Sequence, residues 1–161
     1  MSELFQKALV KISTISEDYK SNKLTLQSAY SLARNEWEVS FIDYNNNNDE
    51  NCICGHYIKN LVYIENKNLG TEAIIGNCCM KQININDYEM IKKIFKNFNE
   101  LKNNELKLKK ETINYAHQKN IINDWEKSFC LDVCKKKNMT LAQGKKWRSV
   151  IDKIKIGFKL I

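Results

Sequence analysis

Apolar residues recur every three or four positions in two stretches at the start of the chain, residues 2–20 and 25–35. This period matches the buried stripe of an amphipathic helix, so we expect two helices here. Ser2 and Thr25 stand at the two starts, and both are residue types whose side chains cap the first amides of a helix. The chain should therefore open with two helices that bury their apolar stripes.

The period changes to two over residues 37–41, where apolar and polar side chains alternate. Such alternation predicts a half-buried strand. Two further strands are expected at 58–65 and 71–75, joined by a turn at 66–70 whose Asn and Gly residues tolerate a left-handed backbone. A short helix should follow at 78–80. We therefore expect a β-hairpin that the strand at 37–41 joins.

The second half of the chain shows only helical periods. One apolar stripe runs over 86–101, a weaker one over 106–121, and a third over 125–136. Thr140 is typical of an N-cap and should begin a last helix that reaches about residue 154. The predicted fold class is therefore α+β, a small β-hairpin embedded in a mainly α-helical protein.

Length and charge describe how the chain is organised. Its 161 residues fit one compact domain, with N-terminal helices and hairpin over 1–84 and a basic helical region over 85–161. Residues 1–80 carry 7 Lys/Arg and 10 Asp/Glu, whereas residues 81–161 carry 19 and 9, a net charge of +10. Such an excess favours a polyanionic partner, above all nucleic acid. The alternative is that these lysines only solvate the outer faces of helices.

The chain contains no run that is long and apolar enough for a membrane-spanning helix. Its first residues have neither a basic region nor an uninterrupted apolar one, so we expect no secretory signal peptide. An intracellular protein, in the cytoplasm or nucleus, is predicted. In such a compartment cysteines are metal ligands or core residues more often than disulfides.

Two cysteine motifs flank the predicted hairpin, Cys-Ile-Cys-Gly-His at 52–56 and Cys-Cys at 78–79. Structural zinc takes four nitrogen or sulfur ligands, and these motifs supply five candidates. We expect Cys52, Cys54 and Cys79 as the first three ligands. Adjacent residues of a helix point about 100° apart, so Cys78 and Cys79 should rarely share one ion. His56 or Cys78 remains for the fourth place, and we favour His56. The alternative is a set of buried free cysteines.

The residues around these motifs suit a zinc site. Gly55 can take a positive φ, which lets backbone amides turn towards thiolate sulfurs. Cys79 falls in the first turn of the predicted short helix, where the positive end of the helix dipole favours a thiolate. A knuckle, a hairpin and a ligand at a helix start form a treble-clef-like zinc finger, with Zn²⁺ in a structural role.

The motifs also stand in a longer pattern. Cys-Ile-Cys-Gly at 52–55 is followed by Ile58, an Asn- and Gly-containing turn at 66–70, and Ile-Gly-Asn-Cys-Cys at 75–79. In this order the segment 35–83 resembles small zinc-binding proteins and domains of phages and large DNA viruses, most of them uncharacterised.

What the resemblance implies is a metal-stabilised module in a viral or phage-like setting, with Cys79 as the closing ligand. Two positions depart from the pattern, because Leu69 replaces the usual Thr of the turn and Ile83 replaces Phe. The C-terminal segment 129–154 is similar to helical tails found beside zinc motifs in phage proteins, with Ala142 in place of Lys.

Basic residues with an aromatic neighbour provide the candidate nucleic-acid contacts. Positive side chains bind phosphates, and an aromatic ring can stack on a base. Trp147 has an alternative reading as a core residue. The candidates are Lys109, Lys110, Lys135, Lys136, Lys137, Lys145, Lys146, Trp147 and Arg148.

The sequence contains no Ser/His/Asp set, phosphate-binding glycine loop or deaminase-type zinc motif. We therefore expect a protein that is not an enzyme and has no small-molecule substrate. Two functions remain: a zinc-stabilised accessory protein that binds nucleic acid through its basic helices, or a protein-interaction module that regulates or inhibits a host or viral enzyme. One stripe of basic side chains in the folded protein would favour the first.

Overall fold

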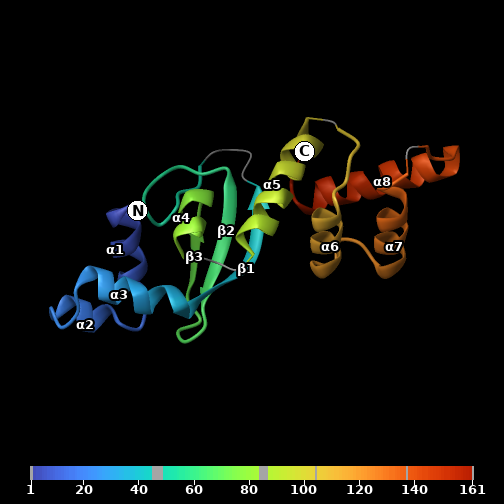
Figure 1. The fold of residues 1–161 in the computed structure, drawn as a ribbon. Helices are drawn as coiled ribbons and strands as arrows, with labels where there is room; N and C mark the ends of the chain where they lie inside the picture. The colour runs from blue at the N-terminus through green and yellow to red at the C-terminus, as the bar shows by residue number, and fades with distance from the viewer. Residues whose placement is uncertain (1, 45–48, 84–86, 104, 137, 161) are drawn as a thin grey trace. The chain divides into compact units, whose positions relative to one another are not determined.

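The computed structural model describes residues 2–44, 49–83, 87–103, 105–136 and 138–160 (Figure 1). The chain forms two compact units, residues 1–88 and 89–161. Lys137, one of the candidate nucleic-acid contacts, lies outside the described residues.

The first unit combines helices with a three-stranded antiparallel sheet in the order β1-β2-β3. This agrees with the predicted α+β class and with a first strand that joins the hairpin. Its elements are α1 (Glu3–Lys11), α2 (Ser16–Lys20), α3 (Leu26–Ala33), the 3-10 helix η1 (Arg34–Glu36), β1 (Trp37–Tyr44), β2 (Asn60–Asn66), β3 (Glu72–Ile75) and α4 (Asn77–Ile83).

The prediction of one helix over 2–20 is wrong, because α1 and α2 are separate helices. The hydroxyl of Ser13 donates to the Leu9 carbonyl oxygen at 2.8 Å, at the end of α1. The next residue, Thr14, donates its backbone N–H and its hydroxyl to the carboxylate of Glu36, at 2.9 and 2.6 Å. These bonds to a residue far along the chain replace the helical ones. Thr25 does cap α3 as expected, accepting from the Ser28 amide.

The three strands of the sheet pair in a defined register. β1 pairs with β2 from Trp37 opposite Asn66 to Tyr44 opposite Asn60, so β1 is three residues longer than predicted. β2 pairs with β3, with Val62 opposite Ile75. α4 lies against β2 (Figure 1). The core between helices and sheet contains Phe5, Leu9, Tyr30, Ile42, Ile64, Ile75 and Met80, all fully buried.

The second unit is helical in every element that the structure describes. α5 covers most of the stripe predicted over 86–101, whereas α6 and α7 are shorter than the stripes predicted over 106–121 and 125–136. The elements are α5 (Tyr88–Lys102), α6 (Lys110–Gln118), α7 (Asp124–Val133) and α8 (Leu141–Gly157). α6 lies against α7, and α7 lies against α8.

Side-chain bonds explain where these helices begin. Buried Asn97 binds the backbone on both sides of Leu108, donating to the Lys107 carbonyl and accepting from the Lys109 amide, so α6 starts only afterwards. Asn123 and Thr140 form capping boxes at the starts of α7 and α8.

The core of the second unit is aromatic. The ring centroid of Phe158 lies 4.7 Å from that of Phe98 and 5.5 Å from that of Tyr115. Phe95 packs edge-on against Phe98. Among the described residues, no helix has both the length and the apolar content needed to cross a bilayer.

Candidate metal centre and nucleic-acid interface

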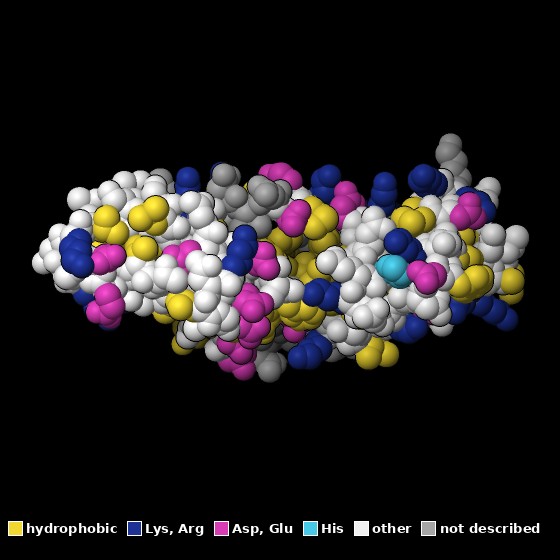
Figure 2. Space-filling model, turned by 90° about the horizontal axis from the view of Figure 1, so that it is seen from below, with side chains coloured by type: hydrophobic (Ala, Val, Ile, Leu, Met, Phe, Trp, Pro, Cys, Tyr) yellow, Lys and Arg dark blue, Asp and Glu magenta, His cyan; other side chains and the backbone are white. Residues whose placement is uncertain are grey.

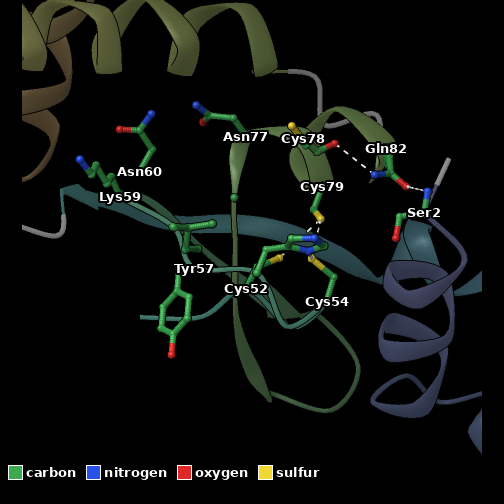
Figure 3. Close-up of a pocket in the computed structure, with 13 residues that line it drawn as sticks. Ser2, Cys52, Cys54, Tyr57, Lys59, Asn60, Asn77, Cys78, Cys79 and Gln82 are labelled. Carbon is green, nitrogen blue, oxygen red and sulfur yellow. Dashed lines mark hydrogen bonds between the residues drawn. The ribbon is translucent and has the colours of Figure 1, made fainter. Parts of the chain in front are cut away.

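Three cysteines from two segments meet in the first unit (Figure 3). The Sγ of Cys79, on α4, lies 3.4 Å from that of Cys52 and 3.5 Å from that of Cys54, and all three sulfurs are within 4.8 Å of one another. Cys52 and Cys79 are buried and Cys54 is half-buried. These three thiols can hold a metal ion.

The backbone between Cys52 and His56 forms a tight knuckle. Gly55 has a φ of +89°, a conformation that side chains with a Cβ rarely adopt. Its N–H donates to the Cys52 carbonyl at 2.7 Å, and the Cys52 N–H donates to the His56 carbonyl at 2.9 Å. The Ile53 N–H donates to Ile74 in β3, which anchors the knuckle to the sheet. Backbone hydrogen bonds thus fix the segment that carries the first two sulfurs.

Gly76 brings the third sulfur close. A Cβ on this residue would lie 2.7 Å from the Cγ2 of Ile58, so only glycine fits this approach of the chain to the segment after the knuckle. The helix that carries Cys79 begins at the next residue. The backbone amides of Cys54 and Gly76 both donate hydrogen bonds to the sulfur of Cys52.

The thiols of Cys52 and Cys79 have very different pKa values. Hydrogen bonds from Cys79 and from the two backbone amides outweigh burial and lower the pKa of Cys52 to about 5. The same hydrogen bond to Cys52, with burial, raises the pKa of Cys79. A thiolate therefore forms first at Cys52, and its charge holds the proton on Cys79. A bound cation would favour the thiolate form of all three cysteines.

Two side chains were predicted as alternatives for a fourth ligand. The Nδ1 of His56 lies 3.3 Å from the Sγ of Cys54, and the imidazole is exposed. Cys78 is also exposed, but its sulfur points away from the other three (Figure 3). All these residues line one open cavity of about 420 Å³. His56 therefore lies beside Cys54, but neither His56 nor Cys78 belongs to the group of ligand atoms that are all within 4.8 Å of one another.

Several candidate nucleic-acid contacts of the second unit are engaged in ion pairs. Lys109 lies 3.0 Å from Glu100, Lys136 lies 2.6 Å from Asp132, and Lys146 lies 3.2 Å from Glu126. These pairs lower the charge that each lysine offers to a partner.

Four other candidates stay exposed. They belong to three different segments, the starts of α6 and α8 and the stretch after α7. These residues are Lys110, Lys135, Lys145 and Arg148.

The expectation that Trp147 stacks on a base is wrong. Its side chain is 4% exposed, and its indole N–H donates to the Leu106 carbonyl at 2.9 Å. The ring therefore joins α8 to the segment before α6. Trp147 is thus a core residue, which was the alternative interpretation. A buried ring leaves no face for a nucleotide.

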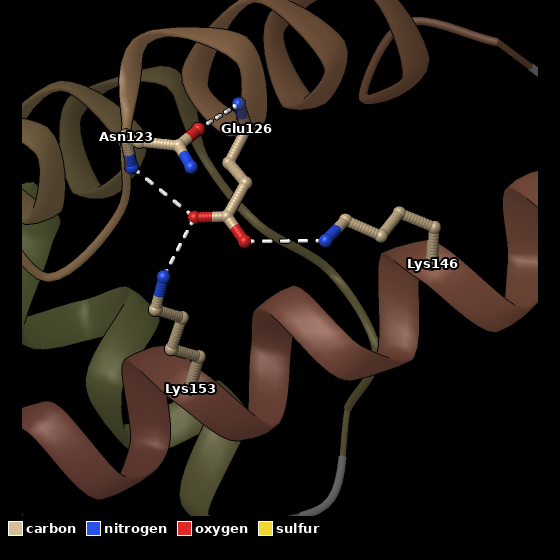
Figure 4. Close-up of polar contacts among 4 residues, drawn as sticks. All are labelled: Asn123, Glu126, Lys146 and Lys153. Carbon is tan, nitrogen blue, oxygen red and sulfur yellow. Dashed lines mark hydrogen bonds and ion pairs between the residues drawn. The ribbon is translucent and has the colours of Figure 1, made fainter.

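Glu126 is the centre of a polar cluster that the sequence analysis did not single out (Figure 4). Its buried carboxylate accepts from Lys153 at 2.8 Å, from Lys146 at 3.2 Å and from the Asn123 amide at 3.1 Å. Burial opposes ionisation, but these bonds outweigh it and lower the pKa of Glu126 to about 2. The Asn-x-x-Glu spacing at 123–126 was a signal for it, since it is typical of a capping box.

The basic side chains do not gather in one stripe on the face that Figure 2 shows, where Lys and Arg alternate with acidic and apolar groups.

An exposed aromatic side chain was also missed. Trp125, read as part of an apolar stripe, is 60% exposed.

Comparison with known proteins adds no assignment. No protein-family model matches the chain, no curated protein is significantly similar to it, and no solved structure matches it. The functional evidence therefore lies in the geometry of the two units themselves.

Proposed function

We propose that the cysteine cluster binds one structural Zn²⁺ through Cys52, Cys54, Cys79 and His56. At the tetrahedral angle, Zn–S bonds of about 2.3 Å separate two sulfurs by about 3.8 Å, and a Zn–N bond of about 2.0 Å places nitrogen about 3.5 Å from sulfur. The Sγ–Sγ distances of 3.4 and 3.5 Å and the distance of 3.3 Å between Cys54 and His56 differ from these values by a few tenths of an ångström. His56 lies outside the group of atoms within 4.8 Å of one another, so its imidazole would turn towards the other two sulfurs to complete the sphere. Thiolate and imidazole ligands in this geometry favour zinc over hard cations.

Four protein ligands would close the coordination sphere, which favours a structural role over a catalytic one. The ion would join the knuckle to α4, whose ligand lies 25 residues beyond Cys54. Knuckle, hairpin and helix would then act as a treble-clef-like unit. This supports an accessory protein that is not an enzyme.

Metal content tests this part of the proposal. The purified protein should contain one zinc per chain, and Co²⁺ exchanged into it should give the absorption of a tetrahedral thiolate site. Cys52→Ser and Cys79→Ser should lose the metal, whereas Cys78→Ser, the matched control, should keep it. His56→Ala should weaken binding without abolishing it. Stoichiometric zinc in Cys79→Ser would refute the ligand set.

The second part of the proposal is that the basic unit binds nucleic acid. One observation carries it: residues 89–161 contain 18 Lys/Arg against 8 Asp/Glu, a net charge of +10. Even with every carboxylate paired, most of this charge remains for an external polyanion. The exposed cations Lys110, Lys135, Lys145 and Arg148 are the contacts we favour. Their spread over several segments fits backbone contacts rather than reading of one groove.

A salt titration tests it. Four phosphate contacts predict that the logarithm of the affinity falls with the logarithm of salt concentration with a slope of about −3 to −4. Replacing Lys145 and Arg148 together by alanine should reduce that slope by about 2. Exposed Lys7 and Lys11 of α1 provide a control double variant with the same loss of charge. Negligible binding at low salt would refute nucleic-acid binding and favour a protein-interaction module.

The phage and viral resemblance of segment 35–83 adds a setting to this proposal, that of an accessory factor acting inside an infected host cell. It names no reaction. The zinc and nucleic-acid parts are independent, because their residues lie in different units.

A further inference from the structure

Trp125 differs from the other two tryptophans of the chain. Trp37 and Trp147 are each 4% exposed, and their indole N–H groups donate to Ser13 and to Leu106. Trp125 is 60% exposed in the first turn of α7. A large and mostly exposed apolar ring within a strongly basic unit offers a contact surface to a partner.

The ring is nevertheless held in place. Phe129, one helical turn later, stacks against it with an interplanar angle of 6° and a centroid distance of 5.4 Å. The ammonium of Lys146, on α8, lies 5.2 Å from the centroid of the indole ring. Lys146 is itself fixed by Glu126, which takes one of its three N–H donors. Phe129 therefore covers part of the indole, and a cation with donors to spare lies over the ring.

We propose that Trp125 is a stacking platform for one base of a single-stranded nucleic acid, with Lys146 binding the adjacent phosphate. This inference rests on the proposed function of the basic unit and names its ligand class. A nucleotide couples a flat π surface to an anion, which matches the ring and the ammonium. In a duplex the base faces are already stacked, so only an unpaired base can reach the indole.

Affinity and strand preference of the whole protein test the platform. Trp125→Ala should weaken binding of an oligothymidylate by about 5- to 150-fold, the loss expected for one base–aromatic stack. Trp125→Phe keeps an aromatic ring and should retain most of the affinity. Binding of a duplex of the same length should be equal in all three proteins. Circular dichroism should be unchanged, because the side chain is exposed.

Fluorescence gives a second readout. Since Trp37 and Trp147 are buried, the red edge of the tryptophan emission belongs to Trp125, and oligothymidylate should quench it where the duplex does not. Single-strand binding that Trp125→Ala leaves unchanged, or emission that is not quenched, would overturn the platform while leaving nucleic-acid binding intact. Absence of any binding by the wild-type protein at low salt would overturn the proposed function instead.

Discussion

Replacing Glu126 by glutamine isolates the charge of one buried carboxylate in the second unit. The side chain is 6% exposed and accepts from two ammonium groups, those of Lys146 and Lys153. Glutamine has nearly the same shape, and its carbonyl oxygen can still accept from the Asn123 amide. The change therefore removes the ionic part of the cluster and keeps the helix cap.

The pKa of the carboxyl group gives the magnitude. It is lowered from 4.5 to about 2 in the folded protein. That difference corresponds to about 3 kcal/mol, since each tenfold change in an ionisation constant is worth about 1.4 kcal/mol. The ammonium groups are 37% and 48% exposed, so water screens part of it, and we expect Glu126→Gln to cost about 2 kcal/mol at pH 7.

The pH dependence has a definite sign. The unfolded chain protonates this group first as pH falls, because its unfolded pKa is the higher one. The stabilisation is therefore complete above the unfolded value of 4.5 and disappears as pH falls through about 2. In Glu126→Gln this part of the pH dependence should be missing.

Urea denaturation followed by circular dichroism at several pH values between 7 and 2 measures both effects. Two transitions should be fitted, because the chain has two compact units. Glu105→Gln, at an exposed position, removes the same charge and should leave stability within about 0.5 kcal/mol. Equal stability of Glu126→Gln and wild type at pH 7, or an unchanged acid profile, would refute the reasoning.

Two further perturbations address the first unit. Gly76→Ala places a Cβ 2.7 Å from the Cγ2 of Ile58 and should cost about 1–3 kcal/mol in thermal or urea unfolding. Gly144→Ala is the control: its Cβ meets open space within α8, so it should not destabilise the protein, and the higher helix propensity of alanine should stabilise it by up to about 1 kcal/mol. Removing metal with a chelator should raise the rates of amide hydrogen exchange in the knuckle and α4. Exchange rates in α7 and α8 should not change. Equal protection of the knuckle with and without chelator would contradict a structural ion.

Much of the fold follows from local patterns in the sequence. Alternation of apolar and polar residues predicted the first strand, and helical periods predicted α3, α5 and α8. These predictions succeeded because each pattern depends only on residues within one element. The three-cysteine cluster was predicted from spacing, since a hairpin returns the chain to where it began. Thr25 and Thr140 were recognised as caps from their type and position.

The errors arose where a distant partner decides the local structure. The break between α1 and α2 depends on Glu36, which lies 22 residues after Thr14. Trp125 shares the apolar stripe of α7 with Val133, yet Val133 is buried and Trp125 is not, while charged Glu126 takes an interior position. The periodicity of α7 does not indicate that Trp125 is exposed and Glu126 buried, because the burial of Glu126 depends on two lysines of α8 that neutralise its carboxylate.

Glu126 also links stability of the second unit to its charge. Its carboxylate binds the ammonium groups of Lys146 and Lys153, and the first of these lies over the Trp125 ring. Folding therefore uses cations that could otherwise bind a phosphate. Glu126→Gln should make the protein less stable. By releasing Lys146 and Lys153, it should also steepen the slope of log affinity against log salt concentration by about 1–2. If Lys146 and Lys153 served folding alone, Glu126→Gln would make the protein less stable without steepening the salt dependence of binding. The two readouts move in opposite directions only if the same ammonium groups serve the core and the ligand.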